Sequence, residues 1–138
     1  MYKSIVELVS EIEKETNSEK QIQLIQKLSK ENKDLKTFFQ WAYFNTQTPV
    51  ITSIGDYKPN HVPIGLSYMK IEKAMRMLPR FFNVHLSKKV TDVLYSILEE
   101  MSWLEVPTYE ALVMNKYTNK LILKETILQA FPEMKEIR

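Results

Sequence analysis

The sequence predicts an all-α fold, in a single compact domain of six to seven helices with one long loop at about residues 45–66. Apolar residues recur every three to four positions through most of the 138-residue chain, which is the helical spacing. Both glycines and three of the six prolines lie between residues 45 and 66. A chain of this length can bury a substantial core as one domain, here residues 1–138.

Punctuating residues set the expected bounds of the helices. Ser18 with Gln21 has the spacing of a capping box, in which a hydroxyl and an amide satisfy the first free backbone amides. Ser87 has the position of a helix cap, and Pro79 and Pro132 each end a helical pattern. The expected helices span about 5–16, from 18 through at least 28, from near 32 through 43, 67–78, 88–101, 107–113 and 120–131.

Composition excludes several classes of function. The chain has no cysteine and only two histidines, which lie far apart at His61 and His85. Thiolate metal sites, cysteine nucleophiles and histidine triads are therefore not expected. Two glycines are too few for the clustered glycines of nucleotide-binding loops. We expect no cofactor, no metal and no catalytic residue.

The N-terminus and the hydropathy pattern indicate a protein outside membranes. No apolar run approaches the roughly 18 residues of a membrane span. Glu7 interrupts the stretch where a signal peptide needs apolar residues. The expected setting is the cytoplasm, and the cytoplasm of a host cell if the protein is viral.

Charge is distributed unevenly, although the total is only +2. Residues 1–48 hold seven basic and seven acidic residues, so that part is neutral. Between residues 58 and 89 there are seven basic residues and one acid, Glu72. A segregated basic segment is typical of a surface that meets phosphates. Solvated helix faces that happen to be rich in lysine explain the same pattern.

Two further patterns leave alternatives open. Residues 115–120 form a turn rich in Asn and Thr before the last expected helix, where free amides and nearby lysines favour a phosphate. The same turn is an ordinary helix start. The methionines Met69, Met75 and Met77 have helical spacing, which suits core filling first and an adaptable binding surface second.

Three stretches together resemble the N-terminal helical DNA-binding domain of bacteriophage-type ATP-dependent DNA ligases. The first, residues 12–43, contains SEKQIQLIQKLSKENKDLKTFFQWAY. The second contains LSYMKIEKAM followed by LSKKVTDVLYSIL, and the third reads LVMNKYTNKLILKETILQAFP. The likeness covers nearly the whole chain. It implies a helical module that binds the backbone and minor groove of double-stranded DNA, nicked or intact, with little sequence specificity.

The resemblance also implies that the chain is not an enzyme by itself. Ligases carry a nucleotidyltransferase domain with a Lys-x-Asp-Gly motif, and no such motif occurs here. The chain is then a domain of a ligase or a free-standing relative. The expected DNA contacts are Lys70, Lys73, Arg76, Lys88, Lys89, Lys116, Asn119, Lys120 and Lys124.

The alternative is a protein-interaction module that uses the same scaffold. A phage could use it to bind or inhibit a host or replication protein. The near-neutral total charge and the methionines at 69–77 favour this alternative, as does the absence of a glycine in the turn at 115–120. A continuous basic stripe would favour DNA, whereas an exposed apolar patch would favour a protein partner.

Overall fold

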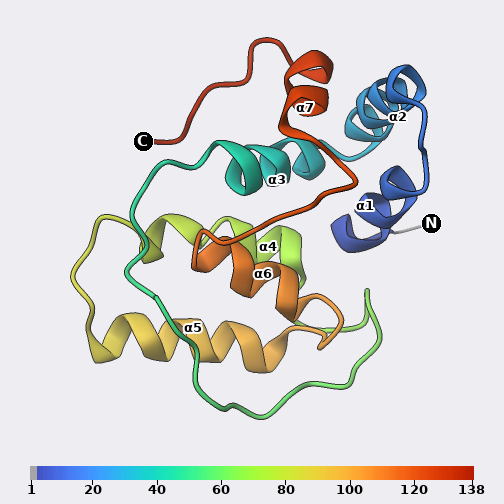
Figure 1. The fold of residues 1–138 in the computed structure, drawn as a ribbon. Helices are drawn as coiled ribbons and strands as arrows, with labels where there is room; N and C mark the ends of the chain where they lie inside the picture. Colours follow the sequence, from blue (N-terminus) through green and yellow to red (C-terminus); the bar gives the residue numbers. More distant parts are fainter. Residues whose placement is uncertain (1–2) are drawn as a thin grey trace. The chain divides into compact units, whose positions relative to one another are not determined.

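The computed structural model describes residues 3–138 and is all-α, as the sequence predicts (Figure 1). Within this range no strand forms, and only isolated backbone bridges occur. The helices are α1 (Ile5–Glu13), α2 (Ser18–Glu31), α3 (Lys33–Phe44), α4 (Ile71–Met75), the 3-10 helix η1 (Leu78–Phe81), α5 (Lys88–Glu100), α6 (Val106–Val113) and α7 (Lys124–Ala130).

Contacts divide the chain into two compact units. The terminal unit comprises residues 5–46 and 118–138, and the central unit comprises residues 47–117 together with Ser4. The expectation of a single domain stays a prediction. Each unit has a buried apolar interior, and each is described below by itself.

In the terminal unit, α2 packs against α1, α3 and α7. The helices bury the apolar face that the sequence predicts, with Ile12, Ile25, Phe38 and Ile127 fully buried. The rings of Phe38 and Phe39 meet edge to face with their centroids 5.6 Å apart. Burying side chains of this size contributes about 1.5–3 kcal/mol each, so this interior stabilises the unit.

The cap of α2 corrects a prediction. Asn17, not Ser18, is the N-cap residue, and its side chain accepts a hydrogen bond from the amide of Lys20 at 3.0 Å. Gln21 does not complete a capping box. Its side-chain nitrogen is buried and donates to the carbonyls of Ile12, Glu15 and Leu121 at 3.0–3.2 Å.

The segment after α7 runs back along α3. Lys36 pairs with Glu133 at 2.7 Å, and Gln40 donates to the carbonyl of Lys135 at 2.9 Å. Beyond the end of α3, Ile137 exchanges backbone hydrogen bonds with Phe44 and Thr46, both 2.9 Å long. This segment is therefore held against α3 at several points along its length.

In the central unit, α6 packs against α4 and η1. Tyr109 on α6 is fully buried, and its hydroxyl donates to the carbonyl of Ala74 on α4 at 2.9 Å. At the start of α6 the buried carboxylate of Glu105 accepts a hydrogen bond from the hydroxyl of Ser4. Met69 and Met75 are buried in this interior, in keeping with the core-filling interpretation.

The predicted long loop is confirmed, and it is fixed at several points rather than by a strand. It passes beside α5 (Figure 1), where the amide of Gly55 donates to the hydroxyl of Tyr95 at 2.8 Å. Backbone bonds also join Val50 to Phe81 and Asn60 to Trp103, at 3.0 and 2.9 Å. Gly65 has φ 91°, a conformation that favours glycine, and it turns the chain toward α4.

Three helices are clearly shorter than predicted. The first, expected at 5–16, is α1 over Ile5–Glu13. The expected helix at 67–78 is α4 over Ile71–Met75 only, because the amide of Met69 bonds to the distant carbonyl of Glu100 and the hydroxyl of Ser67 donates to the carbonyl of Met69. After Met75, bonds to the third residue back tighten the chain into η1, which contains Pro79.

The last helix begins at Lys124 rather than at residue 120. The carbonyls of Leu121 and Ile122 accept hydrogen bonds from the side chains of Gln21 and Tyr43, at 3.0 and 2.8 Å. Because these contacts and the buried Ile122 side chain fix the segment in a non-helical path, the helix starts only after it. None of the helices between residues 3 and 138 is long and apolar enough to cross a membrane.

Candidate nucleic-acid interface

The basic segment of the sequence lies entirely in the central unit. Lys58 is in the long loop, and the other basic residues lie on α4 or at its ends, on η1 and at the start of α5. Lys73, Arg76, Arg80 and Lys89 are exposed, whereas Lys70 is half-buried. The single acid of this segment, Glu72, is buried at 9% exposure. The surface of the segment therefore presents mostly positive charge.

Packing of the apolar positions turns the basic side chains outward. On α4 the buried apolar residues are Ile71, Ala74 and Met75, whereas Lys73 is exposed. On η1 the buried residues are Leu78 and Phe81, which leaves Arg80 exposed. The core of the central unit thus orients the candidate phosphate contacts.

Four of these cations have no acidic partner. Within residues 3–138, neither Lys73 nor Arg76 nor Arg80 nor Lys89 forms an ion pair. The ammonium group of Lys73 instead lies 4.5 Å from the centroid of the exposed Tyr68 ring, a cation–π contact that restricts its position. Unpaired cations are available to bind an anion without first breaking an ion pair.

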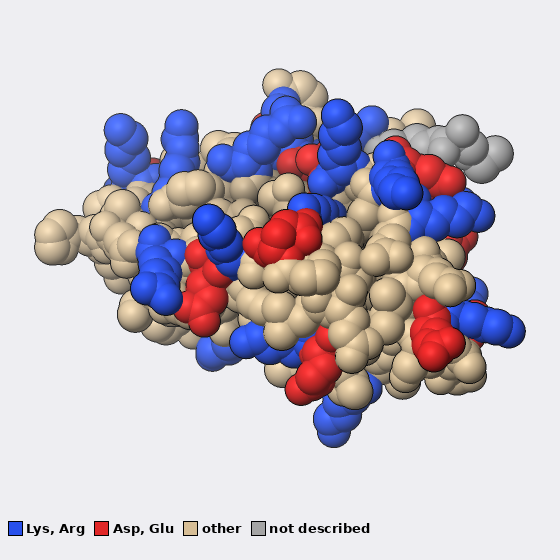
Figure 2. Space-filling model, turned by 90° about the horizontal axis from the view of Figure 1, so that it is seen from above, with Lys and Arg blue, Asp and Glu red and all other residues tan. Residues whose placement is uncertain are grey.

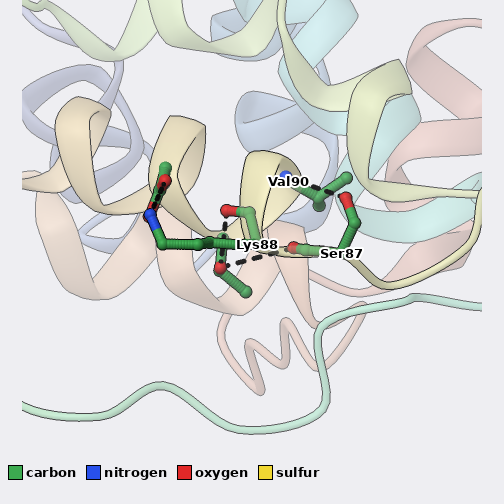
Figure 3. Close-up of polar contacts among 5 residues, drawn as sticks. Ser87, Lys88 and Val90 are labelled. Atoms are coloured by element: carbon green, nitrogen blue, oxygen red, sulfur yellow. Dashed lines mark hydrogen bonds and ion pairs between the residues drawn. The ribbon is translucent and has the colours of Figure 1, made fainter.

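The two lysines at the start of α5, Lys88 and Lys89, differ in whether they form an ion pair. The hydroxyl of Ser87 caps the helix by accepting from the amide of Val90 at 3.3 Å (Figure 3). Lys88 pairs with Asp92 one turn later, 2.8 Å away, and this hydrogen bond raises the pKa of Lys88. The positive charge of Lys88 is therefore balanced by the carboxylate of Asp92, and Lys89 is the stronger candidate for a phosphate contact.

The remaining predicted contacts divide between the two units. Lys116 is exposed in the central unit, and Lys120 and Lys124 are exposed in the terminal unit. Lys124 lies 5.0 Å from the centroid of the Phe44 ring. Asn119 donates to Glu13 and accepts from the amide of Leu121, both at 3.0 Å. Its side chain therefore already holds the local backbone in place.

The turn at residues 115–120 is neither the phosphate-binding turn nor the ordinary helix start that the sequence suggested. Because α7 starts at Lys124, this turn does not adjoin a helix N-terminus. The amide of Lys116 instead bonds to the carbonyl of Ala111 at 2.8 Å, which closes the end of α6. Asn115 has φ 54° and reverses the chain there.

Charge on the surface is mixed at larger scale. On the face shown in Figure 2, Lys and Arg side chains stand singly and in small groups, with Asp and Glu side chains between them. Among the described residues no three His, Asp or Glu side chains are grouped so that they could hold a metal ion. His61 contacts Trp103 with ring centroids 5.6 Å apart, and His85 is exposed.

One hydrogen-bonded pair, Tyr57 and Glu110, was not predicted from the sequence. The hydroxyl of Tyr57 donates to Glu110 at 3.5 Å, across 53 positions in the chain. Burial, helped by the charge of Glu110, raises the pKa of Tyr57 from 10.0 to about 12. Burial also raises the pKa of Glu110. No local pattern joins a loop tyrosine to a helix glutamate at such a separation.

Exposed apolar side chains also gather in the central unit. Leu66 and Tyr68 are 75% and 74% exposed, and Trp103 is 47% exposed. Val84 and Leu86, on the segment before α5, are exposed as well. The protein-interaction alternative drew on Met69, Met75 and Met77, of which the first two are buried and the third is half-buried. Leu104 is 43% exposed as well, so these six residues are the large exposed apolar side chains of the central unit among the described residues.

No protein-family model, curated protein or solved structure matches the chain.

Proposed function

We propose that this chain is a non-catalytic DNA-binding module of the cytoplasm. It binds the backbone and minor groove of double-stranded DNA, nicked or intact, with little sequence specificity. The proposal rests on the four exposed cations without an acidic partner, Lys73, Arg76, Arg80 and Lys89. Contacts of Lys and Arg with phosphate oxygens position a protein on DNA without reading its sequence. The resemblance to ligase DNA-binding domains supports the same function.

The test measures binding of a fluorescent nicked duplex across a salt series. Micromolar binding with a steep fall in affinity as salt rises is expected, because bound lysines release counterions from the duplex. The double variant Lys73→Glu with Lys89→Glu should reduce the slope of log K against log salt by about two. The matched control, Lys27→Glu with Lys30→Glu, changes two exposed lysines of α2 outside the predicted contacts.

An unchanged affinity and slope in the Lys73 and Lys89 variant would contradict the proposal. Equal losses in that variant and in the α2 control would contradict a specific role for Lys73 and Lys89, because total charge alone would then explain binding.

The second candidate is a phage-encoded module that binds or inhibits a host or replication protein. The exposed Leu66, Tyr68 and Trp103 of the central unit favour it, since exposed apolar surface is typical of protein interaction sites, and Tyr and Trp are enriched among the residues that carry most of the binding energy. Absence of duplex binding even at low salt would decide for this candidate over the first.

A further inference from the structure

A pocket of about 360 Å³ lies at the first turn of α5, within the central unit. It is lined by Arg80, Phe81, Val84, Lys89, Val90 and Val93. Three elements contribute to it: η1, the segment before α5, and α5 itself. A pocket of this size accommodates one large side chain or a small ligand.

The chemistry of the lining is divided between walls and rim. Phe81, Val84, Val90 and Val93 make the walls apolar. Arg80 and Lys89 are its only charged residues, and neither has an acidic partner in the part of the chain that the structure describes. An apolar cavity flanked by two unpaired cations is complementary to an apolar group that carries negative charge beside it.

The walls favour an apolar side chain over a nucleobase. The lining offers no amide or hydroxyl side chain, so the polar edge of a buried base would find few hydrogen-bond partners. Val84 is 43% exposed, and Leu86, two residues farther along, is 63% exposed. Exposed apolar side chains therefore continue along the chain after the wall residue Val84, which suits a peptide more than a compact ligand.

We propose that this pocket binds an acidic peptide segment of a partner protein. One large apolar side chain of the peptide fills the cavity between η1 and α5, and flanking carboxylates pair with Arg80 and Lys89. The binding does not depend on the proposed DNA function, although both use Lys89.

The experiment measures fluorescence anisotropy of a labelled short peptide with a central tryptophan between acidic residues. Two matched probes replace the central tryptophan by alanine or the acidic residues by lysines. The alanine probe should bind at least about tenfold more weakly, because it loses the burial of one large apolar side chain. The lysine probe should show no saturable binding.

Variants of the full chain locate the site. Val93→Phe fills the cavity without changing charge and should weaken binding of the tryptophan probe about tenfold. Val84→Ser alters an exposed wall residue, is the variant less demanding on folding, and should weaken binding about threefold. Lys89→Glu should weaken binding about fivefold, whereas Lys58→Glu, an exposed lysine outside the lining, should leave it unchanged.

Equal binding of the tryptophan and alanine probes, unchanged binding by both valine variants, or no saturable binding at all would overturn the proposal. Because the valine variants keep the charge of the chain, their duplex affinity should equal that of the wild type. Peptide binding without duplex binding leaves this proposal standing and removes the DNA function. Duplex binding without peptide binding would leave the DNA function standing and overturn the peptide-binding proposal.

Discussion

Gln21 joins three stretches of backbone through one side-chain amide. Its nitrogen donates to carbonyls at the end of α1, just after α1, and before α7. The bond to the Ile12 carbonyl is buried, whereas those to Glu15 and Leu121 are part-buried. A buried carbonyl left without a donor costs about 1–3 kcal/mol.

We therefore expect Gln21→Ala to lower the free energy of unfolding by about 2–3 kcal/mol, measured by urea denaturation. Gln23→Ala, on an exposed position of the same helix, serves as the control and should change it by less than about 0.5 kcal/mol. Similar losses in both variants would contradict the role of the buried amide, because helix propensity favours alanine over glutamine at either position.

Ionisation of the Glu110 carboxyl destabilises the folded protein. Burial raises the pKa of its carboxyl above the ordinary 4.5, and the hydrogen bond from Tyr57 offsets only part of this effect. Stability from this group is fully present below pH 4.5 and is lost as pH rises through the raised pKa. Glu110→Gln, which does not ionise, should raise the Tm at pH 7 and leave it unchanged near pH 3. An equal gain at both pH values would contradict the raised pKa.

Tyr57 reports on the same pair at alkaline pH. Its raised pKa means that stability is fully present below pH 10.0 and is lost as pH rises toward about 12. Ultraviolet titration of the tyrosines should show one late phase near pH 12 that is missing in Tyr57→Phe. In Glu110→Gln that phase should move to lower pH yet stay above 10, because burial is the largest cause of the shift.

Among the helices, α2 offers a direct test of its cap. Asn17→Ala should lower the free energy of unfolding by about 1 kcal/mol, since the Lys20 amide loses its acceptor. Ser18→Ala lies one residue later, inside the helix, and should have little effect. Chemical denaturation of the two variants distinguishes a cap at Asn17 from one at Ser18. A larger loss of unfolding free energy in Ser18→Ala would support the capping box that the sequence suggested.

Sequence patterns predict an element well when its signals are local. The start of α5 at Ser87 and the start of α3 at Asn32 are confirmed, because each cap bonds to an amide two or three residues away. The shortened α4 and α7 could not be predicted, because contacts of Met69 with Glu100 and of Leu121 with Gln21 decide them. Those partners are 31 and 100 positions distant in the chain.

In the candidate site, too, features that depend on local spacing can be predicted from the sequence, and features that depend on distant contacts cannot. Exposure of Lys73, Arg76 and Lys89 follows from helical spacing, so a sequence reader can predict it. The pairing of Lys88 with Asp92 has the spacing of a helix ion pair and is visible in the sequence as well. The Tyr57–Glu110 contact and the pocket beside Val93 arise only when separate elements meet, so no local pattern indicates them.

At the scale of the whole molecule, the predicted DNA contacts belong to both units. Lys73→Glu in the central unit and Lys120→Glu in the terminal unit should each reduce the salt slope of duplex binding by about one, and the double variant by about two. A slope that changes only with Lys73 would assign DNA binding to the central unit alone. Titrations of the nicked duplex with the three variants at several salt concentrations provide the measurement.

The long loop before α4 is held mainly through its backbone. Amides of Val50, Gly55 and Met69 donate to Phe81, Tyr95 and Glu100, and the carbonyl of Asn60 accepts from Trp103. Such bonds scarcely depend on which side chains the loop carries. Proline is barred where an amide donates, while exposed positions such as Thr52 and Ser53 are free to vary. Much of the amino-acid sequence of this loop can therefore change in evolution while its backbone keeps the same path.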